Sequence, residues 1–125
     1  MITFKNGTSF ETEAIFQGTG RYQGAERSFI EIRVNADTIS FEDLREIYMN
    51  EDALSEITIT DDAGSKMLLT DYTIRAQISE MKSQSGDKET TLLTMKIAQK
   101  TQVEIEQAKQ AQEIDEVKSL LESNA

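Results

Sequence analysis

Five carboxylates lie close together in the sequence, at Glu42, Asp43, Glu46, Glu51 and Asp52. Paired carboxylates hydrolyse glycosidic bonds when they flank a deep cleft and their pKa values are split. Five acids on one stretch are explained more simply as a solvated face, with charges that the helix dipole favours in a first turn. The chain also contains no His and no Cys, which removes the usual general base, the thiol nucleophile and the Ser-His-Asp triad. We therefore expect a protein that is not an enzyme and that uses no cofactor and no metal.

Two other segments have the composition of ligand sites but lack the required spacing. Residues 61–65 (Asp-Asp-Ala-Gly-Ser) offer oxygen ligands, yet a calcium loop needs a Glu at its twelfth position, which here is Tyr72. Residues 18–24 (Gly-Thr-Gly-Arg-Tyr-Gln-Gly) resemble a phosphate loop, but the third glycine of a dinucleotide fingerprint would fall at Gln23. We expect a hairpin turn at the first segment and a surface loop at the second.

Contact with another polypeptide is the remaining chemistry that single residues suggest. Arg21, Tyr22 and Arg27 surround the glycine-rich segment, and Arg and Tyr are enriched among the residues that dominate binding energy at protein interfaces. Loop arginines are also common without any function, so these three residues are candidates for an interface rather than a motif.

The overall charge restricts the partners. The chain has 13 Lys and Arg against 23 Asp and Glu, a formal net charge of −10. Without a cationic excess to release counterions, we expect no nucleic-acid partner. No apolar run approaches the ~20 residues of a membrane helix, and the first residues lack the apolar stretch of a signal peptide, so we expect no membrane partner and no secretion by a signal peptide.

These candidate residues must be positioned by a chain whose first hundred residues have mainly strand patterns. Asn6-Gly7 favours a tight hairpin turn, and residues 28–34 alternate between apolar and polar as in a half-buried strand. Helical spacing and a Ser40 cap predict a short helix over 41–49. Later strands are expected at 72–81 and 90–98, separated by a polar loop at 83–87.

The last part of the chain is predicted to be a long helix from 101 to about 122, because it is rich in good helix formers and has neither Gly nor Pro. Its seam follows the alternating four- and three-residue steps of a heptad, at Val103, Gln107, Gln110, Ile114, Val117 and Leu121. A lone solvated helix is marginal, so the seam must be covered either by its own domain or by a partner chain, and both alternatives stay open. The interface candidates are Val103, Ile114, Val117 and Leu121, followed by Arg21, Tyr22 and Arg27.

Together these patterns predict a mainly β fold of the α+β kind. Residues 1–100 would form an antiparallel β-sandwich or a partly open barrel with the short helix at 41–49, and residues 101–125 would form the C-terminal helix.

Several segments, taken in order, carry a resemblance to a known family. These segments are 2–7 (Ile-Thr-Phe-Lys-Asn-Gly), 21–27 (Arg-Tyr-Gln-Gly-Ala-Glu-Arg) before the strand with Ile30, Ile32 and Val34, 57–59 (Ile-Thr-Ile) before the turn at 61–64, 71–74 (Asp-Tyr-Thr-Ile), and 95–101 (Met-Lys-Ile-Ala-Gln-Lys-Thr) running into an acidic helix. In this order the chain resembles small accessory proteins encoded among the tail genes of tailed bacteriophages and prophages of Gram-positive bacteria.

The resemblance implies a non-enzymatic structural protein of a phage or prophage tail, near the baseplate or the tail tip. Its partners would be other phage tail proteins or further copies of itself, without cofactor or catalytic residues. It would be made in the bacterial cytoplasm and would end in the virion tail. A free-standing prophage-derived binding or regulatory module is the alternative, and an enzyme or carbohydrate-active domain is a third possibility.

Overall fold

The computed structural model describes residues 1–111, and about half of these residues lie in strands. The elements are β1 (Ile2–Phe4), β2 (Ser9–Phe10), β3 (Ala14–Tyr22), β4 (Ala25–Asn35), α1 (Phe41–Met49), α2 (Glu51–Leu54), β5 (Glu56–Thr60), β6 (Lys66–Thr70), β7 (Ile74–Ser85) and β8 (Lys88–Ala98). Residues 102–111 are helical and follow β8 after a short connection.

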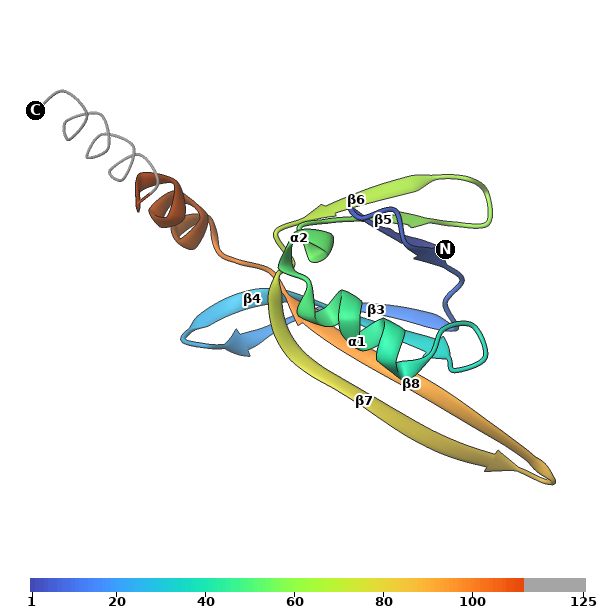
Figure 1. Ribbon diagram of the computed structural model, residues 1–125. Helices are drawn as coiled ribbons and strands as arrows, with labels where there is room; N and C mark the ends of the chain where they lie inside the picture. Colours follow the sequence, from blue (N-terminus) through green and yellow to red (C-terminus); the bar gives the residue numbers. More distant parts are fainter. Residues whose placement is uncertain (112–125) are drawn as a thin grey trace, which may run out of the picture.

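The strands form two four-stranded sheets, shown in Figure 1. One sheet has the order β2-β1-β5-β6 and the other has the order β3-β4-β8-β7, and every neighbouring pair is antiparallel. The predicted mainly β fold with antiparallel sheets is confirmed. The described strands do not close into a barrel.

A shared core holds the two sheets together. Its buried apolar side chains come from both sheets and from both short helices, and the largest of them are Ile2, Phe4, Ile30, Ile32, Val34, Leu44, Leu54, Ile57, Leu93, Met95 and Ile97. In β4 the predicted alternation is present, with Ile30, Ile32 and Val34 buried and the residues between them half-buried. Burial of this apolar surface, at roughly 25 cal/mol per Å², is the main favourable term for the fold.

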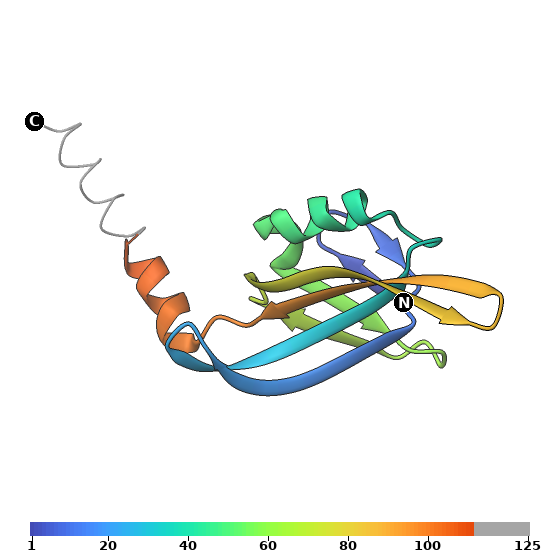
Figure 2. The ribbon, with the colours of Figure 1, turned by 90° about the horizontal axis from the view of Figure 1, so that it is seen from below.

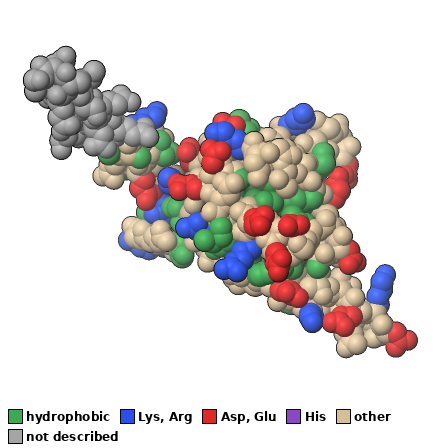
Figure 3. Space-filling view, viewed as in Figure 1, with side chains coloured by type: hydrophobic (Ala, Val, Ile, Leu, Met, Phe, Trp, Pro, Cys, Tyr) green, Lys and Arg blue, Asp and Glu red, His purple; other side chains and the backbone are tan. Residues whose placement is uncertain are grey.

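The short helix α1 has the predicted bounds and the predicted cap. The Ser40 hydroxyl accepts a hydrogen bond from the Asp43 backbone N–H at 3.1 Å. Leu44 and Ile47 face the core, whereas the acidic residues point outward. Acidic side chains accordingly gather over this face of the molecule (Figure 3). The single turn α2, which the sequence reasoning did not include, begins with a second cap in which Asn50 accepts from Ala53 N–H at 3.1 Å.

The turn predicted at residues 61–65 is confirmed. The Asp61 carboxylate accepts hydrogen bonds from the backbone N–H of Ala63 at 3.0 Å and of Ser65 at 2.9 Å, and Gly64 has a positive φ of 86°. The segment therefore joins β5 to β6 as a hairpin whose carboxylate is engaged by the backbone.

The surface loop predicted over residues 18–24 is largely wrong, because Gly18 and Gly20 lie inside β3. The turn is confined to Gln23 and Gly24, which have φ values of 49° and 77°. An edge strand tolerates glycine. At position 20 the glycine also leaves room for a neighbouring ring, because a Cβ on Gly20 would lie only 3.3 Å from the ring of Phe29.

The polar loop predicted over 83–87 is also wrong. Strand β7 continues to Ser85 and β8 begins at Lys88, so the turn has two residues and Gly86 in it adopts a φ of 64°. A glycine at the first position of a two-residue hairpin turn is what the type II′ geometry requires. Cross-strand pairing thus extends into a segment whose composition is typical of a loop.

Candidate functional site

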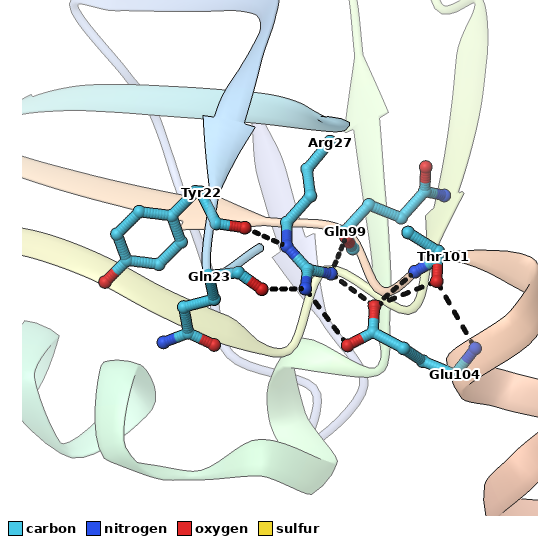
Figure 4. A network of polar contacts seen from close by, with 6 residues as sticks. All are labelled: Tyr22, Gln23, Arg27, Gln99, Thr101 and Glu104. Atoms are coloured by element: carbon cyan, nitrogen blue, oxygen red, sulfur yellow. Dashed lines mark hydrogen bonds and ion pairs between the residues drawn. The ribbon is translucent and has the colours of Figure 1, made fainter. Parts of the chain in front are cut away.

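The most heavily bonded polar side chain of the described residues is Arg27, near the start of β4. Its side chain is 1% exposed, and all five of its N–H donors are used. Nε donates to the Tyr22 carbonyl at 2.7 Å, Nη1 donates to the Gln99 carbonyl at 3.2 Å, and Nη2 donates to the Gln23 carbonyl at 3.3 Å. The remaining donors reach the carboxylate of Glu104, with Nη2 to Oε2 at 3.0 Å and Nη1 to Oε1 (Figure 4).

Glu104 reaches Arg27 from the first turn of the terminal helix, where it also completes a capping box with Thr101. The Glu104 Oε1 accepts from the Thr101 backbone N–H at 2.9 Å and from its hydroxyl at 3.0 Å. In return the Glu104 N–H donates to the Thr101 hydroxyl at 3.3 Å. This reciprocal pattern satisfies donors that every helix N-terminus otherwise leaves open. We call Arg27, Thr101 and Glu104 the helix clamp.

The clamp keeps both of its charges at neutral pH. The hydrogen bond from Arg27, followed by that from the Thr101 backbone, lowers the pKa of the Glu104 carboxyl from 4.5 to about 2. The hydrogen bond to Glu104 in turn raises the pKa of Arg27, against the opposing effect of burial. A bidentate pairing of this kind fixes orientation as well as supplying energy.

The connection between β8 and the helix is fixed at several further points. Gln99 donates from its backbone to Ser28 at 2.9 Å and from its side chain to the Thr70 carbonyl at 3.0 Å. Lys100 donates from its backbone to the Asp71 carbonyl at 2.9 Å and forms an ion pair with Glu51 at 3.2 Å. The root of the helix is therefore tied to both sheets and to α2. Beside the clamp lies a hollow of about 420 Å³.

Beyond its root the helix moves away from the sheets, as Figures 1 and 2 both show for residues up to 111. Ile105 is half-buried, but Val103 is 61% exposed, and the two seam glutamines, Gln107 and Gln110, are exposed. In the described part of the helix, the seam predicted from the heptad spacing is therefore not covered by the chain's own sheets.

The predicted interface residues fall into four groups. Arg21 is exposed and Val103 is exposed, as a contact residue must be. Tyr22 is half-buried, with its hydroxyl donating to the Arg75 carbonyl at 3.3 Å and its ring 6.0 Å from that of Phe29. Arg27 has its guanidinium committed inside the chain, although it shares a hairpin with Arg21. Ile114, Val117 and Leu121 lie outside the described residues.

The partners of Arg27 were not identified from the sequence. Thr101 and Glu104 have the Thr-x-x-Glu spacing of a capping box, which is a local signal that could have placed the start of the helix. The contact with Arg27 has no such signal, since 77 residues separate the arginine from Glu104.

The acidic cluster around α1 does not converge on one site. Asp52 pairs with Lys5 at 3.3 Å and Glu51 pairs with Lys100, whereas Asp43 and Glu46 line a separate hollow of about 380 Å³ beside α1. Within residues 1–111, no group of three or more acidic side chains is placed to hold a metal ion. No helix in this part of the chain is long and apolar enough to cross a membrane.

The fold and the clamp define a mainly β protein of two antiparallel sheets that presents a helix from a fixed root. Comparison with protein-family models, with curated proteins and with solved structures finds no match to this chain.

Proposed function

We propose that the protein is a non-enzymatic structural component of a phage or prophage tail, near the baseplate or tail tip, and that it acts through protein–protein contacts. The observation that carries the proposal is the exposed seam residue Val103 on a helix whose root is held by the clamp. A rigid root with an uncovered apolar position is what a helix needs in order to dock on another polypeptide. The tail assignment is supported by the family resemblance of the sequence.

In this proposal the two sheets form a β-sandwich that serves as a base. The helix continues to about residue 122 and provides the contact surface. Val103, Ile114, Val117 and Leu121 form its apolar contacts, and the two glutamines in the seam keep the association weak. Arg21 and Tyr22, on the hairpin next to the helix root, extend the same surface. Weak contacts of this kind become strong when many copies assemble with symmetry.

The strong negative charge fits an assembly protein. With a net charge of −10, copies repel one another unless specific contacts bring them together. Association is then confined to surfaces in which apolar groups meet, and non-specific aggregation is suppressed.

The test is a double substitution in the seam, Ile114→Asp with Leu121→Asp. We expect it to abolish association through the helix, with further copies or with purified tail proteins, measured by size exclusion coupled to light scattering, while the β signal in circular dichroism persists. A matched control is Gln112→Asp with Ser119→Asp, which keeps the seven-residue spacing but lies on the opposite side of a heptad from the seam. Loss of the β signal in the seam variant would mean that the helix belongs to the core of its own domain.

The alternative, a free-standing binding or regulatory module of prophage origin, gives a different result in the same measurement. A chain that stays monomeric at micromolar concentration and ignores every tail protein offered would favour that module. The exposed Arg21 and Val103 would then form a surface for a partner outside the virion.

A further inference from the structure

The outer edge of β7 is an unpaired strand edge that extends into a projecting arm. In the described chain β7 pairs only with β8, and it stands last in its sheet. The ladder between β4 and β8 ends at Asn35 and Leu92, whereas β7 and β8 continue to pair as far as Ser85 and Lys88. Residues 82–91 therefore form a two-stranded hairpin beyond the sheet, which we call the arm (Figures 1 and 2).

The arm is exposed on all sides. Every residue from 80 to 89 is exposed, and Met81 at the base of the arm is 51% exposed. Its surface carries charges of both signs among uncharged polar atoms (Figure 3). An isolated two-stranded hairpin is marginally stable in water, and a free strand edge presents unpaired N–H and C=O groups to other chains. This edge therefore has backbone groups available for a further strand.

The charges on β7 are self-complementary around Met81. Glu80 and Lys82 flank this residue, both are exposed, and neither forms an ion pair within residues 1–111. If a second copy pairs antiparallel with its two-fold axis at Met81, Glu80 lies opposite Lys82 of that copy on both sides of the axis. Opposite charges that face each other across strands stabilise the pair.

Neighbouring registers are disfavoured by the same residues. Centring the pair on Glu80 would place two carboxylates directly opposite each other, and centring it on Lys82 would oppose two ammonium groups. Like charges directly opposite are destabilising, and a slip by one residue turns every side chain to the other face of the sheet. The exposed charges therefore favour the register centred on Met81 over the registers centred on its two neighbours, and the Met81 register is the one in which Glu80 faces Lys82.

We propose that a second copy of this chain docks on the outer edge of β7, in antiparallel register centred on Met81, and joins the two β3-β4-β8-β7 sheets into one. The local charge permits this approach: β7 carries Arg75 and Lys82 against Glu80, a net of +1 in a chain of −10. This inference rests on the proposed function, because an assembly protein needs its copies to associate. It uses a surface other than the helix.

The first test is disulfide trapping, which is clean because the chain has no Cys. Residues directly opposite in an antiparallel pair have Cα atoms about 4.5 to 5.5 Å apart, inside the range of about 4.4 to 6.8 Å that a disulfide requires. We expect the Met81→Cys chain to form covalent dimers at least about tenfold faster than a matched Ser83→Cys chain under a mild oxidant. In the proposed register the two introduced thiols at position 83 lie about 13 Å apart along the strands.

A mixture gives a second reading of the same register. Residue 79 faces residue 83 of the second copy, so Ser79→Cys and Ser83→Cys chains should form mixed dimers faster than either chain alone forms its own dimer. Equal trapping at positions 81 and 83, without a preference for the mixed pair, would overturn the proposal.

The second test changes charge without cysteine. Glu80→Lys and Lys82→Glu should each stop β7 association on its own, because each places like charges opposite one another. An equimolar mixture of the two variants should associate again, since positions 80 and 82 are both positive in one variant and both negative in the other. Light scattering on the separate and mixed proteins reports this result, and association that is the same in all three samples contradicts it.

The outcomes separate this inference from the proposed function. If the helix variant Ile114→Asp with Leu121→Asp abolishes association while the β7 charge variants do not affect it, the helix interface stands and the β7 interface fails. If the charge variants alone abolish association, the β7 interface stands and the helix role fails.

Discussion

The molecule has two projections, the terminal helix and the β7–β8 arm, and the figures show them leaving opposite ends of the sheets. At the root of the helix the buried charge is paired within the chain, because every N–H donor of Arg27 bonds to a backbone carbonyl or to Glu104. Where the arm leaves the sheet, Glu80 and Lys82 are exposed and have no ion-pair partner among residues 1–111. The difference indicates that the helix is held in a fixed direction, whereas the arm keeps its polar groups available to another chain.

The largest effect is expected from removing the buried member of the clamp. Arg27→Met keeps an unbranched side chain but leaves three carbonyls and a carboxylate without their donor, and we expect the free energy of unfolding to fall by about 3 kcal/mol. Urea denaturation followed by circular dichroism measures this loss. The control is Arg21→Met, an exposed arginine of the same hairpin, which should change stability by less than about 0.5 kcal/mol. Equal effects at the two positions would show that the clamp contributes no stability.

A smaller effect is expected from acid. A carboxyl whose pKa is lowered on folding contributes stability that is present above its unfolded pKa of 4.5 and is lost as the pH falls through its folded value of about 2. Because the Glu104 side chain is 37% exposed, solvent screening limits this contribution to about 1–2 kcal/mol. The measurement is the difference in unfolding free energy between the wild type and Glu104→Gln. That difference should shrink between pH 5 and pH 2, and one that stays constant over this range contradicts the assignment.

The smallest effect on the whole molecule is expected at the tip of the arm. Gly86 has a φ of 64°, so Gly86→Ala should strain the turn by about 1 kcal/mol. Since the arm lies outside the core, local opening should increase while global unfolding is unchanged. Hydrogen exchange of the amides at 82–91 should become several-fold faster, and those of β4 should not change. Gly18→Ala, at a glycine with open space around it and no positive φ, is the control.

Local signals in the sequence were sufficient for the elements that depend on neighbouring residues. The Ser40 cap fixed the start of α1, and the Asp61 turn joined two strands as expected. The arm was missed because Ser83, Gln84 and Ser85 have a loop-like composition, and their strand conformation comes from pairing with residues 88–90. Pairing across a hairpin depends on the partner strand as much as on intrinsic preference.

The candidate site was less accessible to sequence reasoning than the fold. Because arginine is enriched at interfaces, the sequence makes Arg27 an interface candidate, and nothing near it in the sequence indicates a buried partner. The hydrogen bonds that enclose it come from the β3–β4 turn, from Gln99 and from Glu104, and they depend on the assembled fold. Exposure of Val103, by contrast, agrees with its position in a seam that heptad spacing alone identifies.

The turn between β3 and β4 has a consequence for how such a helix is aimed. Two of the carbonyls that hold Arg27 belong to Tyr22 and Gln23. The turn therefore helps to position the guanidinium that binds Glu104. An insertion or deletion of one residue at Gln23 would displace these two carbonyls and so loosen the hold of Arg27 on Glu104, without altering a residue of the helix. A short turn distant in the sequence thereby takes part in orienting the helical residues 102–111.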